Sequence, residues 1–315
     1  MSKKRTINDF DIDFMGKSKL AAMLSASALV VCLLSILFRG FDLGLDFTGG
    51  TVIELGYQTP AELSEIRSAL EQEGLEAATI QYFGSRTDIL IRLAPQEGEE
   101  DSAQLSDRVF RTLNQAAEGK VELRRVEFVG PQVGEELREK GGLAVLFSLI
   151  GILIYVALRF EWRFAVGAVI ALIHDVIFTV GMFSIFQIPF DLTVLAAVLA
   201  VIGYSLNDTI VIFDRIRENF RRMRKGTVIG ITNTSINQTL SRTIVTSGTT
   251  LLVLFALYFL GGEAISGFSL ALIIGIFVGT YSTIYVATAV VIWLGLSRSD
   301  LTPVKKEGAE LDAMP

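Results

Sequence analysis

Long runs of apolar residues, separated by short polar segments, make up most of this chain. Each run is long enough to cross a hydrocarbon core of about 30 Å at the helical rise of 1.5 Å per residue. The pattern therefore predicts six transmembrane helices, at Leu20–Phe38, Gly142–Leu158, Phe164–Phe186, Leu192–Phe213, Thr243–Leu260 and Phe268–Leu296. The sixth run is the longest, so we expect its helix to tilt, to bend or to project beyond the bilayer.

The first run shares one feature with a cleavable signal peptide, since Lys17 and Lys19 precede it. Its apolar stretch is longer than the usual ~7–15 residues of such a peptide. It also ends in Phe38-Arg39-Gly40-Phe41 and has no A-x-A cleavage site. We therefore expect residues 20–38 to stay in the protein as a membrane anchor.

Residues 39–141, between the first two runs, follow a different pattern. Alternation of apolar and polar residues predicts four strands, and helical spacing predicts two helices. In chain order these are Thr51–Tyr57 (strand), Pro60–Gly74 (helix), Ala78–Phe83 and Asp88–Leu93 (strands), Glu99–Ala117 (helix) and Val121–Val129 (strand). The order β-α-β-β-α-β is that of the ferredoxin-like split βαβ arrangement. We therefore expect one α+β domain, folded as a unit near residues 50–130. Its two helices should cover the sheet face that carries Val52, Leu55, Ile89 and Ile91.

Basic residues indicate how the chain crosses the membrane. They gather before the first run, between runs two and three, between runs four and five, and after the sixth: Lys3, Lys4, Arg5, Lys17, Lys19; Arg159, Arg163; Arg215, Arg217, Arg221, Arg222, Arg224, Lys225; Lys305, Lys306. Cytoplasmic loops carry the excess of Lys and Arg, so both termini should be cytoplasmic and residues 39–141 exported. The expected layout is a cytoplasmic segment at 1–19, the first helix at 20–38, the exported domain, five helices within 142–296 and a cytoplasmic tail at 297–315.

Composition agrees with a polytopic membrane protein. The chain has 315 residues, of which 51% are hydrophobic, and a mean hydropathy of +0.50, which is too apolar for an ordinary soluble domain. The net charge of −6 is spread unevenly and decides nothing by itself. Cys32 is the only cysteine, so an intramolecular disulfide is excluded, and we interpret it as a small buried hydrophobe.

Sequence features of enzymes are missing. The one Walker-like fragment, Gly16-Lys17-Ser18, lacks the glycine five residues earlier and has no preceding strand, which argues against a phosphate-binding loop. His174 is the single histidine, and with Asp175 alone it is too small a ligand set for a zinc site. We therefore expect a protein that is not an enzyme, with no metal, no cofactor and no nucleic-acid partner.

Polar residues inside the apolar runs are the candidates for function. His174 and Asp175 lie near the middle of the third run, and Asn207 and Asp208 lie near the inner end of the fourth. Arg242 begins the fifth run, and hydroxyl residues that include Thr246 follow it. An ionised Asp in mid-membrane costs ~2.5–3.5 kcal/mol on insertion scales, so such groups normally face the interior of a helix bundle and find partners there.

Two kinds of interpretation fit these residues. Asp208 could snorkel to the inner surface, Asp175 could form a structural pair with His174, the hydroxyls could serve helix packing, and Arg242 could be a positive-inside anchor. Because three such sites occur on three runs, we favour a proton or ion relay. Its candidate members are Asp208, Arg242, Asp175, His174, Asn207 and Thr246.

An ordered set of motifs then resembles a known family. The motifs are Gly44–Thr51 (GLDFTGGT, with Asp46, Gly49 and Gly50), Val129–Gly134, the His174-Asp175 pair, Tyr204–Thr209, Asp214–Asn219 (with Asp214 and Arg215) and Asn237–Thr243. In this order and topology the chain resembles the SecF family, the smaller partner in the bacterial SecD–SecF complex. That family belongs to the resistance–nodulation–division superfamily, which pairs two six-helix halves.

The resemblance implies a function. Such proteins use the proton-motive force to promote late, ATP-independent stages of polypeptide translocation across the bacterial inner membrane, with residues 39–141 in the periplasm. Asp208 matches the family's essential transmembrane carboxylate, and Arg242 matches its partner. Because the chain holds one six-helix half, the implied partners are a SecD-like subunit, the SecYEG channel, YajC, translocating polypeptides and membrane lipid.

Alternatives from other classes stay open at this point. One is a small-molecule or lipid exporter of the same superfamily, and another is a passive assembly subunit whose polar residues only hold helices together. The coupling ion, proton or sodium, is also open. For the contact with a second six-helix subunit we expect the small-residue face of the sixth run, with Gly275, Gly279 and Ser282.

Overall fold

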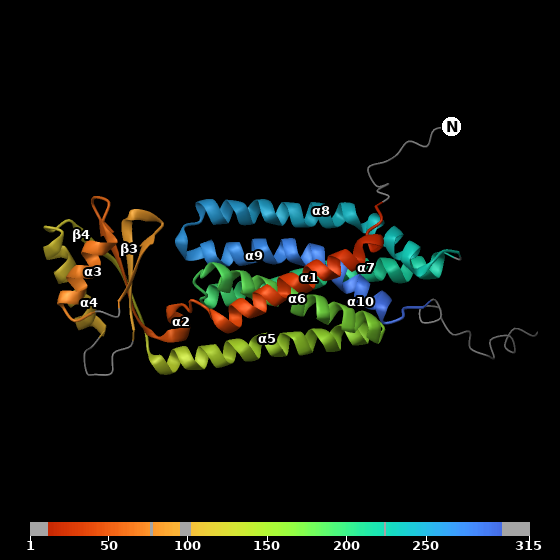
Figure 1. The fold of residues 1–315 in the computed structure, drawn as a ribbon, viewed down its shortest axis with the longest axis horizontal. Helices are drawn as coiled ribbons and strands as arrows, with labels where there is room; N and C mark the ends of the chain where they lie inside the picture. Colours follow the sequence, from red (N-terminus) through yellow and green to blue (C-terminus); the bar gives the residue numbers. More distant parts are fainter. Residues whose placement is uncertain (1–11, 76–77, 95–101, 224, 298–315) are drawn as a thin grey trace, which may run out of the picture.

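The computed structural model divides the chain into a small α+β domain and a long bundle of helices, arranged end to end (Figure 1). It describes residues 12–75, 78–94, 102–223 and 225–297. The predicted cytoplasmic segment up to residue 11 and the tail from residue 298 lie outside the described residues, as do the first residues of the predicted helix Glu99–Ala117. The start of the first membrane helix and the end of the last lie at the end of the bundle away from the sheet (Figure 1).

All six predicted membrane helices are present. A short 3₁₀ turn, Met15–Lys17, precedes the first of them. The helices are α1 (Ser18–Phe38), α5 (Pro131–Arg159), α6 (Trp162–Phe186), α7 (Leu192–Arg222), α8 (Val228–Leu260) and α9 (Glu263–Ser282), which continues through a π-helical turn (Thr283–Ala287) into α10 (Thr288–Trp293). Six helical stretches in the described residues are long and apolar enough to cross a membrane. The sixth is interrupted by the π turn, which is a rare form of helix.

Several helices extend beyond the predicted apolar runs. α5 begins at Pro131 rather than Gly142, α7 continues past Phe213 to Arg222, and α8 begins at Val228 rather than Thr243. An apolar run ends at its first charged residues, but the helix continues beyond them, because charged side chains are well solvated outside the hydrocarbon core. The extended ends of α7 and α8 also pack together, since Asn219 Nδ2 donates to Ser235 Oγ and Gln238 Oε1 at 2.9 Å each.

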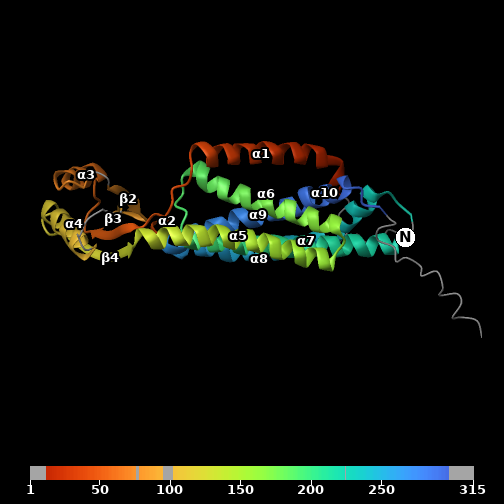
Figure 2. The same cartoon turned by 90° about the horizontal axis from the view of Figure 1, so that it is seen from below.

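The bundle has a buried centre and an apolar periphery. α6, α7 and α9 lie in the middle and carry most of the buried side chains, whereas α1, α5 and α8 expose long apolar faces. Seen from below, α1 lies along one side of the bundle, and α5 and α8 lie on the other (Figure 2). Exposed rows of Leu, Ile, Val and Phe on the outer helices are what contact with lipid tails or another subunit requires.

Glycines on α9 let α7 and α9 approach closely. A Cβ atom added at Gly275 would collide with the side chain of Val201, and one at Gly279 would lie 3.0 Å from Cβ of Ser205. Ser282, the third residue of the same stripe, is also fully buried. Our expectation that this stripe contacts another subunit is therefore wrong, because these residues are used for packing within the chain.

The α+β domain has the predicted order of elements. It contains β1 (Gly50–Tyr57), α3 (Leu63–Gln72), β2 (Thr79–Phe83), β3 (Ser85–Leu93), α4 (Ser102–Ala116) and β4 (Val121–Val129). The strands form one antiparallel sheet in the order β2-β3-β1-β4. This order is compatible with the ferredoxin-like arrangement. β3 begins three residues before the predicted strand, at Ser85, because the β2–β3 turn is tight.

The sheet packs its helices on one face and turns the other toward the bundle. Ile53, Leu55, Ile89 and Ile91 have no exposed surface and form a core with apolar residues of α3 and α4. The prediction that Val52 lies on this face is wrong. Because successive side chains of a strand point to opposite sides, Val52 lies on the face opposite Ile53 and borders a cavity next to the bundle.

We predict that Tyr57 makes the α+β domain sensitive to alkaline pH. Burial raises the pKa of Tyr57 to about 12 from its ordinary value of 10. A raised folded-state pKa means that the contribution to stability is complete below about pH 10 and is lost as the pH rises through about 12. Thermal unfolding of the full chain in detergent, followed at pH 9, 11 and 12, should show this loss for wild type and a smaller one for Tyr57→Phe. Equal losses in the two proteins would contradict the prediction.

A second prediction concerns helix packing. Gly275→Ala should lower the unfolding temperature of the chain in detergent, because its methyl group collides with Val201 and pushes α9 away from α7. Gly203→Ala is the matched control, since a Cβ there meets no atom within 4 Å and helix propensity favours alanine. The packing argument fails if both variants unfold at the same temperature.

Candidate functional site

A buried carboxylate joins three helices in the centre of the bundle. Asp175 on α6 has no exposed surface. Its Oδ2 accepts hydrogen bonds from Ser205 Oγ of α7 at 2.6 Å and Ser282 Oγ of α9 at 2.8 Å. Its Oδ1 lies 3.0 Å from His174 Nδ1. The predicted pair of His174 and Asp175 is therefore present, and it is part of a larger cluster.

The cluster depends on the close approach of α7 and α9. Gly279 lacks a side chain at the point where Asp175 Oδ2 and Ser205 Oγ meet, and a Cβ there would lie 3.5 Å and 3.1 Å from them. A carboxylate removed from water needs donors from the protein, because its unpaired burial is very costly. With two hydroxyls and an imidazole around it, Asp175 is well supplied and holds α6, α7 and α9 in register.

A second set of hydroxyls continues from this cluster toward the π-helical turn. Thr209 Oγ1 lies 2.9 Å from Thr283 Oγ1 and also donates to the Ser205 carbonyl at 3.1 Å. Thr283 is the first residue of the π turn, a deviation that often marks functional positions in helices. The sequence patterns did not identify Ser282, Thr209 or Thr283 as members of a polar site. Ser205 and Thr209 recur at helical spacing in the sequence, but Thr283 and Ser282 are far away along the chain, so the sequence cannot pair them.

Asp208 is also buried, but its surroundings differ from those of Asp175. It is one helical turn beyond Ser205 on α7 and only 5% exposed. Among the described residues it makes no side-chain hydrogen bond and no ion pair. Arg242 on α8 is exposed and attracts the Asp208 carboxylate over a longer distance than a direct ion pair. The structure thus places Arg242 near Asp208 without joining them.

The other two candidates of the relay lie apart from these carboxylates. Asn207 is exposed on the outer face of α7. Thr246 Oγ1 donates to the carbonyls of Arg242 and Thr243 within its own helix, each at 3.0 Å. A relay through Asn207 or Thr246 therefore stays a prediction.

The outer face of α7 is made of small residues. Ala196, Ala200, Gly203 and Asn207 recur every three or four positions and are all exposed. No atom lies within 4 Å of a Cβ built at Gly203. This face runs beside the buried Asp208 and is open to a neighbour in the membrane.

The motif residues Asp214 and Arg215 lie beyond the apolar part of α7. Arg159 Nη2, at the end of α5, donates to both carboxylate oxygens of Asp214 at 3.2 and 3.3 Å. Arg215 Nη1 donates to Glu218 Oε2 at 2.8 Å. Both contacts are solvent-exposed and worth little as isolated ion pairs. The Arg159–Asp214 pair joins α5 to α7, whereas the Arg215–Glu218 pair lies within α7.

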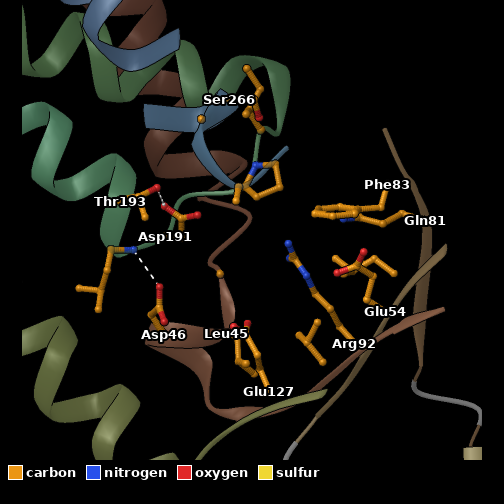
Figure 3. A pocket seen from close by; sticks show the side chains of 18 of the residues that line it. Leu45, Asp46, Glu54, Gln81, Phe83, Arg92, Glu127, Asp191, Thr193 and Ser266 are labelled. Carbon is orange, nitrogen blue, oxygen red and sulfur yellow. Dashed lines mark hydrogen bonds between the residues drawn. The ribbon is translucent and has the colours of Figure 1, made fainter. Parts of the chain in front are cut away.

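The motif with Asp46, Gly49 and Gly50 forms the junction between the sheet and the bundle. A short helix, α2 (Leu45–Thr48), leads into β1. Gly49 has φ +70°, and a Cβ there would lie 2.9 Å from Cα of Pro131, so only glycine fits. Gly134 of α5 packs against the same turn, since a Cβ there would lie 3.0 Å from the Gly49 nitrogen. Asp46 Oδ2 accepts a hydrogen bond from the backbone N–H of Leu192 at 3.0 Å (Figure 3).

A cavity of about 650 Å³ lies between the open sheet face and the near end of the bundle (Figure 3). From the sheet it is lined by Val52, Glu54, Gln81, Phe83, Leu90, Arg92, Arg125 and Glu127. Asp191 and Thr193 line it from the bundle, and Asp46 of α2 lines it from the junction between the two. The lining mixes apolar side chains with charges of both signs. Among the described residues, no group of three or more His, Cys, Asp and Glu side chains is arranged to hold a metal ion.

Family models match the chain in two places. The model described as "Protein export membrane protein SecD/SecF, C-terminal" matches residues 109–297, and that described as "SecD/SecF GG Motif" matches residues 34–61. Among similar proteins, those from Vibrio alginolyticus, Pseudomonas aeruginosa and Escherichia coli O157:H7 are 53%, 52% and 48% identical. The alignments cover 96%, 93% and 95% of this chain and 97%, 94% and 93% of the relatives, and each relative is named "Protein translocase subunit SecF".

Solved structures of SecDF have the same fold. The crystal structure of SecDF from Thermus thermophilus, described as a translocon-associated membrane protein, is 38% identical with a TM-score of 0.82. A second structure, of SecDF in its super-membrane-facing form, is 39% identical with a TM-score of 0.67. Each alignment covers 93% of this chain and 40% of the SecDF chain. This chain therefore spans less than half the length of the SecDF proteins.

Proposed function

This chain belongs to the SecF family of protein translocase subunits, and we propose that it uses the proton-motive force to promote late, ATP-independent steps of polypeptide export across the bacterial inner membrane. It is a multi-pass membrane protein and a non-enzymatic accessory subunit of Sec protein export. In the proposed orientation both termini are cytoplasmic and residues 39–141 are periplasmic, as the distribution of Lys and Arg favours.

The observation that carries this proposal is the contrast between two buried carboxylates. Asp175 is held by donors from its own and two neighbouring helices, and Asp208 makes no hydrogen bond to another described residue. The neutral and ionised forms of an acid without donors differ strongly in the free energy of their burial. Gain or loss of a proton at Asp208 is therefore able to change how α7 packs. Arg242, on α8, interacts electrostatically with that charge.

The gradient supplies enough energy for such a change. One elementary charge that crosses 100 mV releases about 2.3 kcal/mol. That free energy shifts a two-state equilibrium roughly fifty-fold. We propose that the exported sheet domain moves in response and that an emerging polypeptide engages it at the cavity beside Glu54 and Arg92, where apolar and charged groups alternate.

A SecD-like subunit is the proposed partner at α7. The chain corresponds to one six-helix half and to 40% of the SecDF chain. The outer face of α7, with Ala196, Ala200, Gly203 and Asn207, admits another helix closely, and Asn207 gains a polar neighbour there. Weaker association with the SecYEG channel and with YajC is part of the same proposal.

Substitution of Asp208 tests the relay. Asp208→Asn keeps the shape and the hydrogen-bonding capacity but cannot exchange a proton, so gradient-dependent stimulation of export should be abolished while ATP-driven export persists. The measurement is export into energised inverted vesicles with and without a protonophore. A parallel arm with a sodium ionophore distinguishes sodium from protons as the coupling ion.

Asp214→Asn is the matched control, because it is the same substitution on the same helix in a solvent-exposed ion pair. It should respond to the protonophore as wild type does. If Asp208→Asn also responds as wild type does, the relay is wrong and a passive assembly subunit becomes the better interpretation.

A bulky substitution on the outer face of α7 tests whether the SecD-like subunit binds there. Gly203→Leu should leave the isolated chain folded, since no atom lies within 4 Å of that position, but it should prevent co-purification of the SecD-like subunit after mild detergent extraction. Gly151→Leu on α5 is the control, because this glycine is equally open. Normal co-purification with Gly203→Leu would place the partner elsewhere.

A further inference from the structure

We propose that Asp46 is a positioning residue that couples the exported sheet domain to α7, the helix that carries Asp208. The inference rests on the proposed function and names the contact through which movement passes between the two domains. It concerns a hydrogen bond from the backbone N–H of Leu192 to Asp46 Oδ2, 3.0 Å long (Figure 3).

This hydrogen bond lies at the first residue of α7. The first N–H groups of a helix have no partner within the helix, and carboxylates near them are favourable because of the helix dipole. α7 already has a cap of its own, since Asp191 Oδ1 accepts from the N–H of Val194 at 2.8 Å. Asp46 adds a second carboxylate to the same helix end, and it comes from a segment far away along the chain. Ordinary capping therefore does not require it.

Asp46 is joined to the sheet domain along the chain. It belongs to α2, which is followed by Gly49 and then directly by β1, a central strand of the sheet. α2 also packs on the first turns of α5, which follow β4 after Gly130: the carbonyl of Phe47 accepts from Arg138 Nη2 at 3.0 Å, and Gly49 approaches Gly134 closely. A displacement of β1 that carries α2 with it relative to α7 therefore has to stretch or break the hydrogen bond between Asp46 and Leu192.

The segment before α2 is joined to the same loop. The N–H of Gly44 donates to the Phe190 carbonyl, and the N–H of Phe190 donates to the Asp42 carbonyl, both at 2.8 Å. Phe47 and Phe41 also pack against the Phe190 ring. These contacts hold the chain beside the start of α7, and their backbone hydrogen bonds end at residue 190, before the helix. Asp46 is the side chain of this junction that reaches the helix itself.

α7 is continuous from Leu192 through Asp208 to Arg222. Asp208 lies about 24 Å along the helix from Leu192, at the usual rise of 1.5 Å per residue. A small shift or rotation of α7, caused by a proton at Asp208, therefore moves its first residue as well. Through Asp46 that movement reaches β1 and the wall of the cavity that Val52 and Glu54 form.

The test compares two caps of one helix. Asp46→Ala and Asp191→Ala each remove one carboxylate that accepts from the first turn of α7. A purely structural role predicts the same effect for both. The coupling role predicts that only Asp46→Ala loses gradient-dependent stimulation of export, down to the level measured with a protonophore. Asp46→Asn should restore most of it, because its side-chain oxygen still accepts from Leu192.

A distance measurement gives a readout that a structural cap would not change. Spin labels at Ser68→Cys on α3 and Leu260→Cys at the end of α8, in a Cys32→Ala background, report the separation of the sheet domain from the bundle in the full chain with its partner subunit. We expect the distance distribution to change when wild-type vesicles are energised, to change likewise with Asp191→Ala, and not to change with Asp46→Ala.

Failure of this inference is separable from failure of the proposed function. If Asp46→Ala keeps the stimulation and the distance change, or if Asp191→Ala loses them equally, the coupling role is wrong. The same holds if wild type is stimulated without any distance change. If Asp208→Asn, measured in parallel, behaves as wild type does, the proposed function itself is wrong.

Discussion

A carboxylate without access to water must find its hydrogen-bond donors inside the protein, and the bundle is organised around this constraint at Asp175. Two of its donors come from different helices, Ser205 on α7 and Ser282 on α9. These hydroxyls reach it because Gly279 lets the two helices approach closely. The register of α6, α7 and α9 is thus coupled to one buried charge, since a shift of either neighbour would leave polar groups unpaired in an apolar interior.

α7 connects this fixed centre with the parts of the molecule that we propose to move. Its middle is tied to Asp175 through Ser205, and Asp208 follows one turn later without a donor among the described residues. Its first residue is joined to Asp46 and hence to the sheet. The satisfied carboxylate of Asp175 favours one packing, and we propose that protonation of Asp208 changes it. α7 therefore contacts the buried charge of α6 through Ser205 and carries Asp208 itself.

The outer helices of the bundle present two kinds of surface, as expected for one half of a larger assembly. α1, α5 and α8 expose large apolar side chains, as contact with lipid requires, whereas the outer face of α7 is small and includes the polar Asn207. In lipid, helices associate through close packing and polar contacts rather than through the hydrophobic effect. The SecF relatives match nearly the whole of this chain, and the SecDF chains are more than twice as long, which agrees with a missing second half.

The sequence by itself determined the six membrane helices, the order of elements in the α+β domain and the polar residues that are costly in lipid. These follow from local properties, namely the length of apolar runs, periodicity and the presence of Asp175 or Asp208 within them. The SecF motifs were recognisable for the same reason, because each lies within a few neighbouring residues. The helix ends were less well determined, since a charge ends an apolar run without ending the helix.

Tertiary structure alone decided which residues meet. The sequence does not place Ser282 on Asp175, because they are separated by 107 positions. The sequence also does not show that Gly275 packs inward against Val201 while Gly203 faces outward. Small residues occur both in contacts within a chain and in contacts between subunits. The assignment of Val52 to the wrong sheet face has a related cause: an offset of one residue reverses every side chain of a strand. The position of Asp46 on the first residue of α7 likewise depends on how the sheet and the bundle pack, and no local pattern in the chain encodes it.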